Sequence, residues 1–344
     1  MKVKHDIAYY YPTGHQSHYE YGHPERPERV ETIRQALTEA GLWEAGLHVA
    51  PQAISHDLLE SIHNPGYLRA LDYACRQGMH LDMDTYTTPQ SWGLALETVG
   101  GSVSVADSVW KRQAGRGFAL SRPPGHHATA ERGMGFCLLN NVSLAAEYLI
   151  RKNGARRLAI IDTDLHHGNG TQDIFWERGD VFYISTHQHP LYPGSGSLDE
   201  RGESAGEGAT ANFPLPPGSG DQAFTTIFDE LILPLLDRYQ PEMLLVSFGF
   251  DPHWRDPLGH LQLSARGYGD QMAKLTRWAD KNSQGRIALF LEGGYDLEAA
   301  SACSIAVVSA LLGLEWSDPL GPAPRPEGAS WRIITDRARR LWSL

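Results

Sequence analysis

Short apolar runs alternate with longer stretches of helical periodicity along most of this chain. The candidate strands are the runs at 117–120, 158–162, 181–186, 243–248 and 287–291. The candidate helices are the stretches at 27–40, 89–113, 139–152, 223–239, 265–281 and 299–312. Such alternation predicts an α/β fold with a mostly parallel central sheet and helices on both faces.

Gly- and Pro-rich loops and clusters of polar residues follow most of the candidate strands. In sheets of this kind ligands bind outside the carboxyl ends of the strands. We therefore expect the functional site at the C-terminal ends of the strands. No linker interrupts the pattern, so residues 1–344 are expected to form a single domain, with the Pro-rich and then amphipathic tail after residue 314 packed on the same body.

Charge and composition narrow the class of protein. The 30 basic and 41 acidic residues give a net charge of −11, which argues against nucleic acid as a partner. No run approaches the ~18 apolar residues of a membrane span, and the N-terminus lacks a secretory signal, so we expect a cytoplasmic protein without membrane contact. The three cysteines, Cys75, Cys137 and Cys303, are too scattered for disulfides or a thiolate zinc site and are expected to be buried and free.

The segment 162–170, Asp-Thr-Asp-Leu-His-His-Gly-Asn-Gly, is the most informative motif. It follows a buried strand, where residues two apart share a face, so Asp162, Asp164 and His166 can converge on one point. Two carboxylates and an imidazole suit a divalent metal such as zinc. The alternative is a polar turn with a histidine that only satisfies hydrogen bonds.

Three further clusters follow other candidate strands. The first is 122–127, Arg-Pro-Pro-Gly-His-His, whose loop presents two adjacent histidines that can exchange protons near neutral pH. The second brings Asp251, which can cap a helix or complete a three-ligand metal site. The third, Glu-Gly-Gly-Tyr, places the Tyr295 hydroxyl on a tight turn, where it can donate to a developing oxyanion.

These motifs, in this order, resemble those of the histone deacetylase family. The segments 23–29, His-Pro-Glu-Arg-Pro-Glu-Arg, and 135–137, Gly-Phe-Cys, with Asn140 and Asn141, also match its pattern. The resemblance runs from about residue 23 to 295. It is closest to the class II-like branch, which includes the bacterial histone-deacetylase-like amidohydrolases. These enzymes are related to the acetylpolyamine amidohydrolases. It implies the arginase/deacetylase-like fold.

The resemblance also implies roles for individual residues. The zinc ligands would be Asp164, His166 and Asp251. The remaining catalytic positions would be His126 and His127, their partners Asp162 and Asn169, and the oxyanion donor Tyr295. The substrate-binding positions would be Phe136 and Tyr192 as channel walls, Leu258 at the rim, and the motif glycines Gly135 and Gly294.

Two finer expectations follow. A neutral amide at Asn169 should leave His127 less basic than His126, which is paired with a carboxylate. The family also binds a structural potassium ion through backbone oxygens of Asp162, Asp164 and His166, near the Ser185 hydroxyl.

The expected activity is zinc-dependent hydrolysis of an N-acyl amine, most simply the acetyl-lysine of a peptide, to a free amine and a carboxylate. An acetylpolyamine or small-metabolite amide hydrolase of the same family is the alternative, although Leu258, where a polyamine-selective relative carries glutamate, disfavours polyamines. A binuclear ureohydrolase and a catalytically silent acyl-lysine-binding module are the other readings. Self-association into a homo-oligomer is left open.

Overall fold

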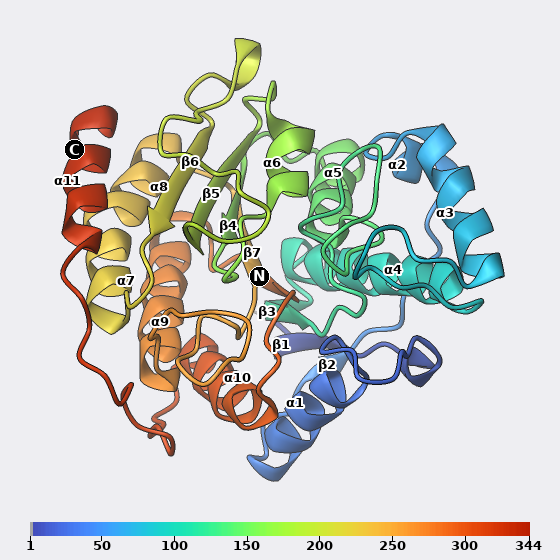
Figure 1. The fold of residues 1–344 in the computed structure, drawn as a ribbon, viewed down its shortest axis with the longest axis horizontal. Helices are drawn as coiled ribbons and strands as arrows, with labels where there is room; N and C mark the ends of the chain where they lie inside the picture. Colours follow the sequence, from blue (N-terminus) through green and yellow to red (C-terminus); the bar gives the residue numbers. More distant parts are fainter. Residues whose placement is uncertain (1–2) are drawn as a thin grey trace.

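The computed structural model describes residues 3–344 and builds them around one 8-stranded sheet in the order β2-β1-β3-β8-β7-β4-β5-β6 (Figure 1). Every pair of neighbouring strands is parallel, which confirms the predicted sheet. The strands are β1 (His5–Tyr10), β2 (Leu47–His48), β3 (Ala114–Ala119), β4 (Leu158–Asp162), β5 (Val181–Gln188), β6 (Thr210–Leu215), β7 (Met243–Phe248) and β8 (Ile287–Leu291).

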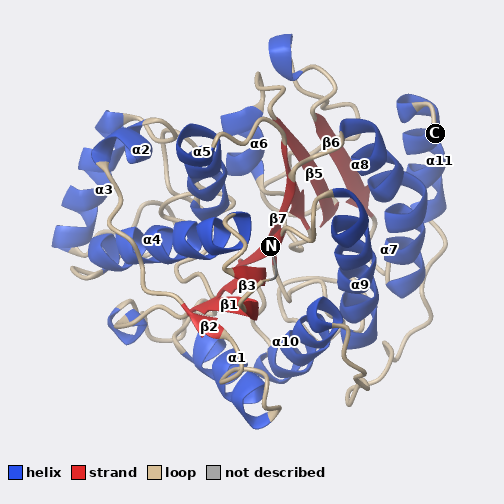
Figure 2. Ribbon diagram, turned by 180° about the vertical axis from the view of Figure 1, so that it is seen from behind, coloured by secondary structure: helices blue, strands red, loops and turns tan. Residues whose placement is uncertain are grey.

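Helices cover both faces of this twisted sheet (Figure 2). One face carries α1 (Glu28–Glu39), α7 (Asp221–Ile227), α8 (Leu233–Tyr239), α9 (Ala265–Asn282), α10 (Leu297–Leu312) and α11 (Trp331–Trp342). The other carries α2 (His56–Glu60), α3 (Pro65–Gln77), α4 (Ser91–Trp110), α5 (Asn141–Asn153) and α6 (Asn169–Phe175). The side chains of β4 alternate between the two faces and contribute to both hydrophobic cores. Ala159 and Ile161 face the first layer of helices, and Leu158 and Ile160 face the second.

The strands and helices predicted from the sequence are all present, within a few residues of the expected ends. The stretch 223–239 is continuous from α7 to α8 but passes through a π-helical turn, η3 (Phe228–Ile232). Pro234 lies two residues after the end of this turn, and a proline removes one helical hydrogen-bond donor, which accounts for the locally wider helix.

Three strands were not predicted from the sequence pattern. The edge strand β6 reads Thr-Ala-Asn-Phe-Pro-Leu, and its polar residues and proline are atypical of a strand, although all of its residues are buried. β2 has only two residues, and β1 begins with the polar pair His5 and Asp6. The tail prediction is confirmed, because α11 packs against β6 and α7.

Two further expectations can be compared with the structure. Cys75, Cys137 and Cys303 are buried and free, as predicted. Within residues 3–344, none of the helices combines the length and the apolar character that crossing a bilayer requires.

The sheet order determines where the polar clusters meet. β3, β8, β7 and β4 are consecutive neighbours at the centre of the sheet. The loops that carry the four sequence motifs leave the carboxyl ends of these four strands. The motifs, which are spread along the chain from residue 122 to residue 295, therefore converge at one edge of the sheet, where the fold predicts the site.

Candidate active site

Asp164, His166 and Asp251 form one cluster beyond the ends of β4 and β7. One ligand atom from each lies within 4.8 Å of the other two. His166 Nδ1 is 3.2 Å from Asp164 Oδ1 and 3.2 Å from Asp251 Oδ2. Asp164 and Asp251 are almost completely buried.

This cluster fits a divalent metal. Asp251 Oδ2 is buried and, apart from the close approach of His166 Nδ1, has no hydrogen-bond partner among the described residues, although a buried carboxylate oxygen normally has one. Burial and the charge of Asp164 raise the pKa of Asp251 to about 7, while the His166 imidazole opposes that rise. Two carboxylates and one imidazole around an unpaired carboxylate oxygen suit a divalent metal with three protein ligands and an open fourth position.

The spacing of the sequence motif predicted that Asp162 would converge with Asp164 and His166, and this prediction is wrong. β4 ends at Asp162, so the strand alternation that grouped Asp162 with Asp164 and His166 does not continue beyond it. Asp162 Oδ2 instead lies 3.1 Å from His126 Nδ1 and accepts a hydrogen bond from Tyr183 at 3.2 Å. The partner role implied by the family resemblance describes this position better than the spacing did.

The tandem histidines lie side by side, with ring centroids 4.0 Å apart, and have different partners. His126 faces the Asp162 carboxylate, whereas His127 Nδ1 lies 2.8 Å from Asn169 Oδ1. The Asn169 amide nitrogen points to the Met134 sulfur at 3.6 Å, so its oxygen accepts from His127 Nδ1. His127 Nε2 is then the basic nitrogen.

These partners separate the two pKa values. Burial lowers the pKa of His126, but the carboxylates of Asp162, Asp164 and Glu292 outweigh it and raise the pKa to about 10. Burial and the neighbouring His126 and His166 hold the pKa of His127 well below its usual value. His127 is the less basic histidine, as predicted from its amide partner.

Tyr295 stands on the turn after β8, which we call the Tyr295 turn (residues 292–296). Burial raises the pKa of its phenol well above the usual value, so the hydroxyl stays protonated as a donor. Its ring lies 5.9 Å from the Phe136 ring, and the Arg29 guanidinium lies 4.8 Å from its centroid. Gly294 has φ +108, and a side chain there would meet Phe250, so the turn requires glycine.

The two predicted channel walls border the same site. The Tyr192 ring lies 5.2 Å from the His127 ring and is 40% exposed, so this residue reaches from solvent to the histidines. Gly135, with φ +54, lies between them, and a Cβ added there would be 2.4 Å from His127 Cδ2. Leu258 is half-buried, and its backbone N–H bonds the carboxylate of Asp256.

Several buried groups around the site were not assigned from the sequence. Glu292 Oε2 accepts the N–H groups of Gly125 and His126, which fixes the histidine loop to β8. Arg29 donates to the carbonyls of Glu292 and Gly294 at 2.5 and 2.7 Å. Arg29 lies in the motif at 23–29, and Glu292 begins the Glu-Gly-Gly-Tyr motif. Their membership of these motifs was the sequence signal that could have identified them.

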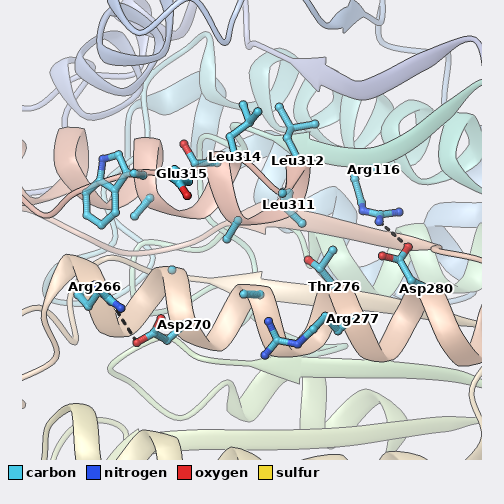
Figure 3. Close-up of a pocket in the computed structure, with 17 residues that line it drawn as sticks. Arg116, Arg266, Asp270, Thr276, Arg277, Asp280, Leu311, Leu312, Leu314 and Glu315 are labelled. Carbon is cyan, nitrogen blue, oxygen red and sulfur yellow. Dashed lines mark hydrogen bonds and ion pairs between the residues drawn. The ribbon is translucent and has the colours of Figure 1, made fainter.

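The predicted site residues do not line the wide hollow between α9 and the end of α10 (Figure 3). There Arg266 pairs with Asp270 at 3.5 Å, and Arg116 pairs with Asp280 at 2.6 Å. These two ion pairs neutralise four of the charged side chains that line the hollow.

Comparison with known proteins gives the same class of protein as the fold and the site. The family model for the histone deacetylase domain matches residues 23–311. A probable deacetylase of Archaeoglobus fulgidus is 40% identical over 299 residues, covering 86% of this chain and 83% of that protein. The histone deacetylase-like amidohydrolase of Pseudomonas aeruginosa is 36% identical, covering 87% of this chain and 80% of that protein.

The crystal structure of the HDA15 HD domain superposes with a TM-score of 0.89 at 31% identity, and the match covers 98% of this chain and 95% of that one. These matches and the central parallel sheet define an amide-hydrolysing deacetylase fold. This chain belongs to the histone deacetylase family. It is a hydrolase of linear amide C–N bonds, as the sequence predicted.

Proposed function

We propose that this protein is a zinc-dependent deacylase that hydrolyses the side-chain amide of acyl-lysine, in the first place acetyl-lysine. The observation that carries the proposal is the cluster of Asp164, His166 and Asp251, joined to two histidines of opposite basicity. Tyr192 and Phe136 provide aromatic walls beside this chemistry, which suit the slender alkyl stem of a lysine.

Each group has a distinct part in the reaction. Asp164, His166 and Asp251 would hold a zinc ion, which would supply Lewis-acid polarisation of the acyl carbonyl and would lower the pKa of water. His127, neutral and with Nε2 free, accepts the proton of the attacking water and passes it to the departing amine nitrogen. His126, which carries a proton opposite Asp162, contributes positive charge near the developing oxyanion.

Tyr295 completes the arrangement as the oxyanion donor. Its protonated hydroxyl bonds the oxygen that gains charge when water adds to the carbonyl. The amide C–N bond then breaks, and a carboxylate and a free amine leave. The proposed site recognises the acyl group and a slender stem, so other acylated amines with a stem of this shape are the alternative substrates.

We also propose a structural potassium ion beside this site, bound by backbone oxygens of Asp162, Asp164 and His166 and by the Ser185 hydroxyl. His187 Nε2–H donates to the carbonyl of Gly196 at 3.1 Å, so its Nδ1 accepts the Ser185 hydroxyl proton at 2.9 Å. The lone pairs of Ser185 Oγ are then available to a cation.

A binuclear metal site is not supported. A second metal needs an additional carboxylate next to the ligand cluster, and the nearest one along the chain, Asp162, bonds His126 and Tyr183 instead.

The test is a fluorogenic acetyl-lysine peptide assay of the purified chain, with and without chelator and after zinc is restored. We expect activity that disappears on chelation and returns with zinc. Asp251→Ala should lose bound zinc, measured by metal analysis. A full zinc complement in that variant, or undiminished turnover after metal removal, would contradict the proposal. Acyl-lysine peptides with longer acyl chains and acetylpolyamines, assayed in parallel, define the substrate.

A further inference from the structure

Asp256 is a buried carboxylate beyond β7 that belongs to neither the metal cluster nor the histidine pair. It is 6% exposed, and its hydrogen-bond partners are three backbone N–H groups. Oδ2 accepts from Tyr295 at 2.7 Å and from Asp296 at 3.2 Å, while Oδ1 accepts from Leu258 at 3.0 Å. Burying an acid is costly unless such donors compensate it, so this carboxylate has a specific structural reason to be there.

These bonds connect two separate parts of the site. The Tyr295 turn follows β8, whereas Leu258 lies in the loop after β7, close to the ligand Asp251 along the chain. Asp256 therefore fixes the backbone of the catalytic tyrosine to the loop that carries a metal ligand. Its Oδ1 holds the backbone of Leu258, the residue predicted for the channel rim.

The rest of the Tyr295 turn is held by other groups. Arg29 bonds the carbonyls of Glu292 and Gly294. Gly293 N–H donates to Asp164 Oδ2 at 2.8 Å, and the Gly293 carbonyl accepts from Phe250 N–H at 3.2 Å. The N–H of Tyr295 itself is bonded by Asp256. The peptide between Gly294 and Tyr295 is therefore held by Arg29 at its carbonyl and by Asp256 at its N–H, and Asp256 is the side-chain partner on the tyrosine's own backbone.

We propose that Asp256 is the positioning residue for Tyr295, and that it sets the distance between the tyrosine hydroxyl and the metal cluster. This inference rests on the proposed function, because it assigns Asp256 an effect only through the oxyanion donor. Displacement of a catalytic group by ~1 Å can cost up to ~10²-fold in rate. The loss cannot exceed the loss caused by removing the tyrosine hydroxyl.

A double-mutant cycle tests the proposal on the full zinc-loaded chain with a fluorogenic acetyl-lysine peptide. Asp256→Ala should lower kcat by ~10- to 10²-fold with KM within ~3-fold of wild type and zinc content unchanged. In the Tyr295→Phe background, the same change should alter kcat by less than ~2-fold, because there is no hydroxyl left to misplace. An equal loss in both backgrounds, or no loss in the wild-type background, overturns the proposal.

Two variants of the same residue sharpen the test. Asp256→Asn should direct its single oxygen to the N–H pair of Tyr295 and Asp296, and so restore kcat while KM rises, because its NH₂ then opposes the Leu258 N–H. Asp256→Ser keeps a polar group but is too short to span both partners. If Asp256→Ala does not fold, Asp256→Ser replaces it in the cycle, with the same expected and overturning outcomes.

Asp221 offers a matched control. Its carboxylate accepts the N–H and hydroxyl of Ser264 at 2.9 and 2.6 Å, which joins the starts of α7 and α9. Asp221→Ala should lower the melting temperature without changing kcat in either background. A wild-type chain without amidase activity, or a fully active Tyr295→Phe variant, would instead refute the proposed function, so the two failures are distinguishable.

Discussion

His127 Nδ1 lies 2.8 Å from the side-chain oxygen of Asn169, so the proposed general base has a neutral amide as its partner. The neighbouring His126 has the Asp162 carboxylate in the same position relative to its ring. A carboxylate stabilises an imidazolium much more than an amide does. The carboxylates around His126 raise its pKa and keep it protonated, whereas burial and the neighbouring His126 and His166 lower the pKa of His127, whose amide partner adds no compensating charge.

Asn169→Asp should move the acid limb of the kcat/KM profile to higher pH. The active form of His127 is neutral, and its pKa lies well below the usual value in the native protein. A carboxylate at position 169 raises that pKa, so less of the neutral form is present at any given pH near it. The measurement is kcat/KM against pH for both proteins. Asn169→Ala is the control, since it removes the partner without adding charge, and superimposable wild-type and Asn169→Asp profiles would contradict the assignment.

Tyr295→Phe should lower kcat by ~10²–10³-fold, the usual cost of one oxyanion donor. The ring remains between Phe136 and Arg29, so the fold and the metal cluster should be unaffected. Steady-state kinetics and metal analysis of the same preparation check both statements. Near-normal turnover, or loss of zinc along with activity, would show that the hydroxyl does not have this role.

Gly135→Ala should lose activity through the channel rather than through unfolding. An added Cβ would lie 2.4 Å from His127 Cδ2 and 3.0 Å from Tyr192 Cε1, so the imidazole or the channel wall must move. Gly154→Ala is the control, because Gly154 also has a positive φ, +73, but open space around its Cβ. Both variants should lose ~1–2 kcal/mol of stability from backbone strain. Only Gly135→Ala should lose turnover, and equal activity of the two variants would contradict the close contact.

Local patterns sufficed to predict the parallel sheet and its layers. Runs such as 158–162 and 243–248 are uniformly apolar and lie between helical stretches, as buried parallel strands do. β6 was missed because its identity as a strand comes from pairing with β5, while its own sequence contains Asn212 and Pro214. Pairing between distant segments is a tertiary property that a local pattern does not contain.

The site shows the same division. Asp164, His166 and Asp251 could be proposed from residue types and a family resemblance, because metal ligands must be of a few kinds. Asp256 could not, because its partners are backbone N–H groups, and the backbone of Tyr295 has no sequence signature. Asp162 illustrates the limit of spacing arguments, since its direction depends on where β4 ends.

Glu25→Gln should destabilise the protein in a pH-dependent way. The buried Glu25 carboxylate accepts from Arg122 at 2.8 Å and from Arg29 at 3.1 Å. Burial raises the pKa of Glu25, but the two guanidinium groups outweigh it and lower the pKa to about 2, from a reference value of 4.5. A depressed pKa in the folded state means that the ionised carboxylate adds stability above pH 4.5, and that this stability is lost as the pH falls toward 2.

At neutral pH the variant leaves two buried guanidinium groups without their shared anion, which should cost ~3–5 kcal/mol in the free energy of unfolding. The difference from wild type should shrink as the pH is lowered from 4.5 toward 2, because the native carboxylate then also becomes neutral. Urea unfolding of both proteins across this range measures the difference. Glu28→Gln, an exposed acid at the start of α1, is the control and should change stability little at any pH. A Glu25→Gln difference that is constant with pH would show that the cost comes from packing and not from the buried ion pairs.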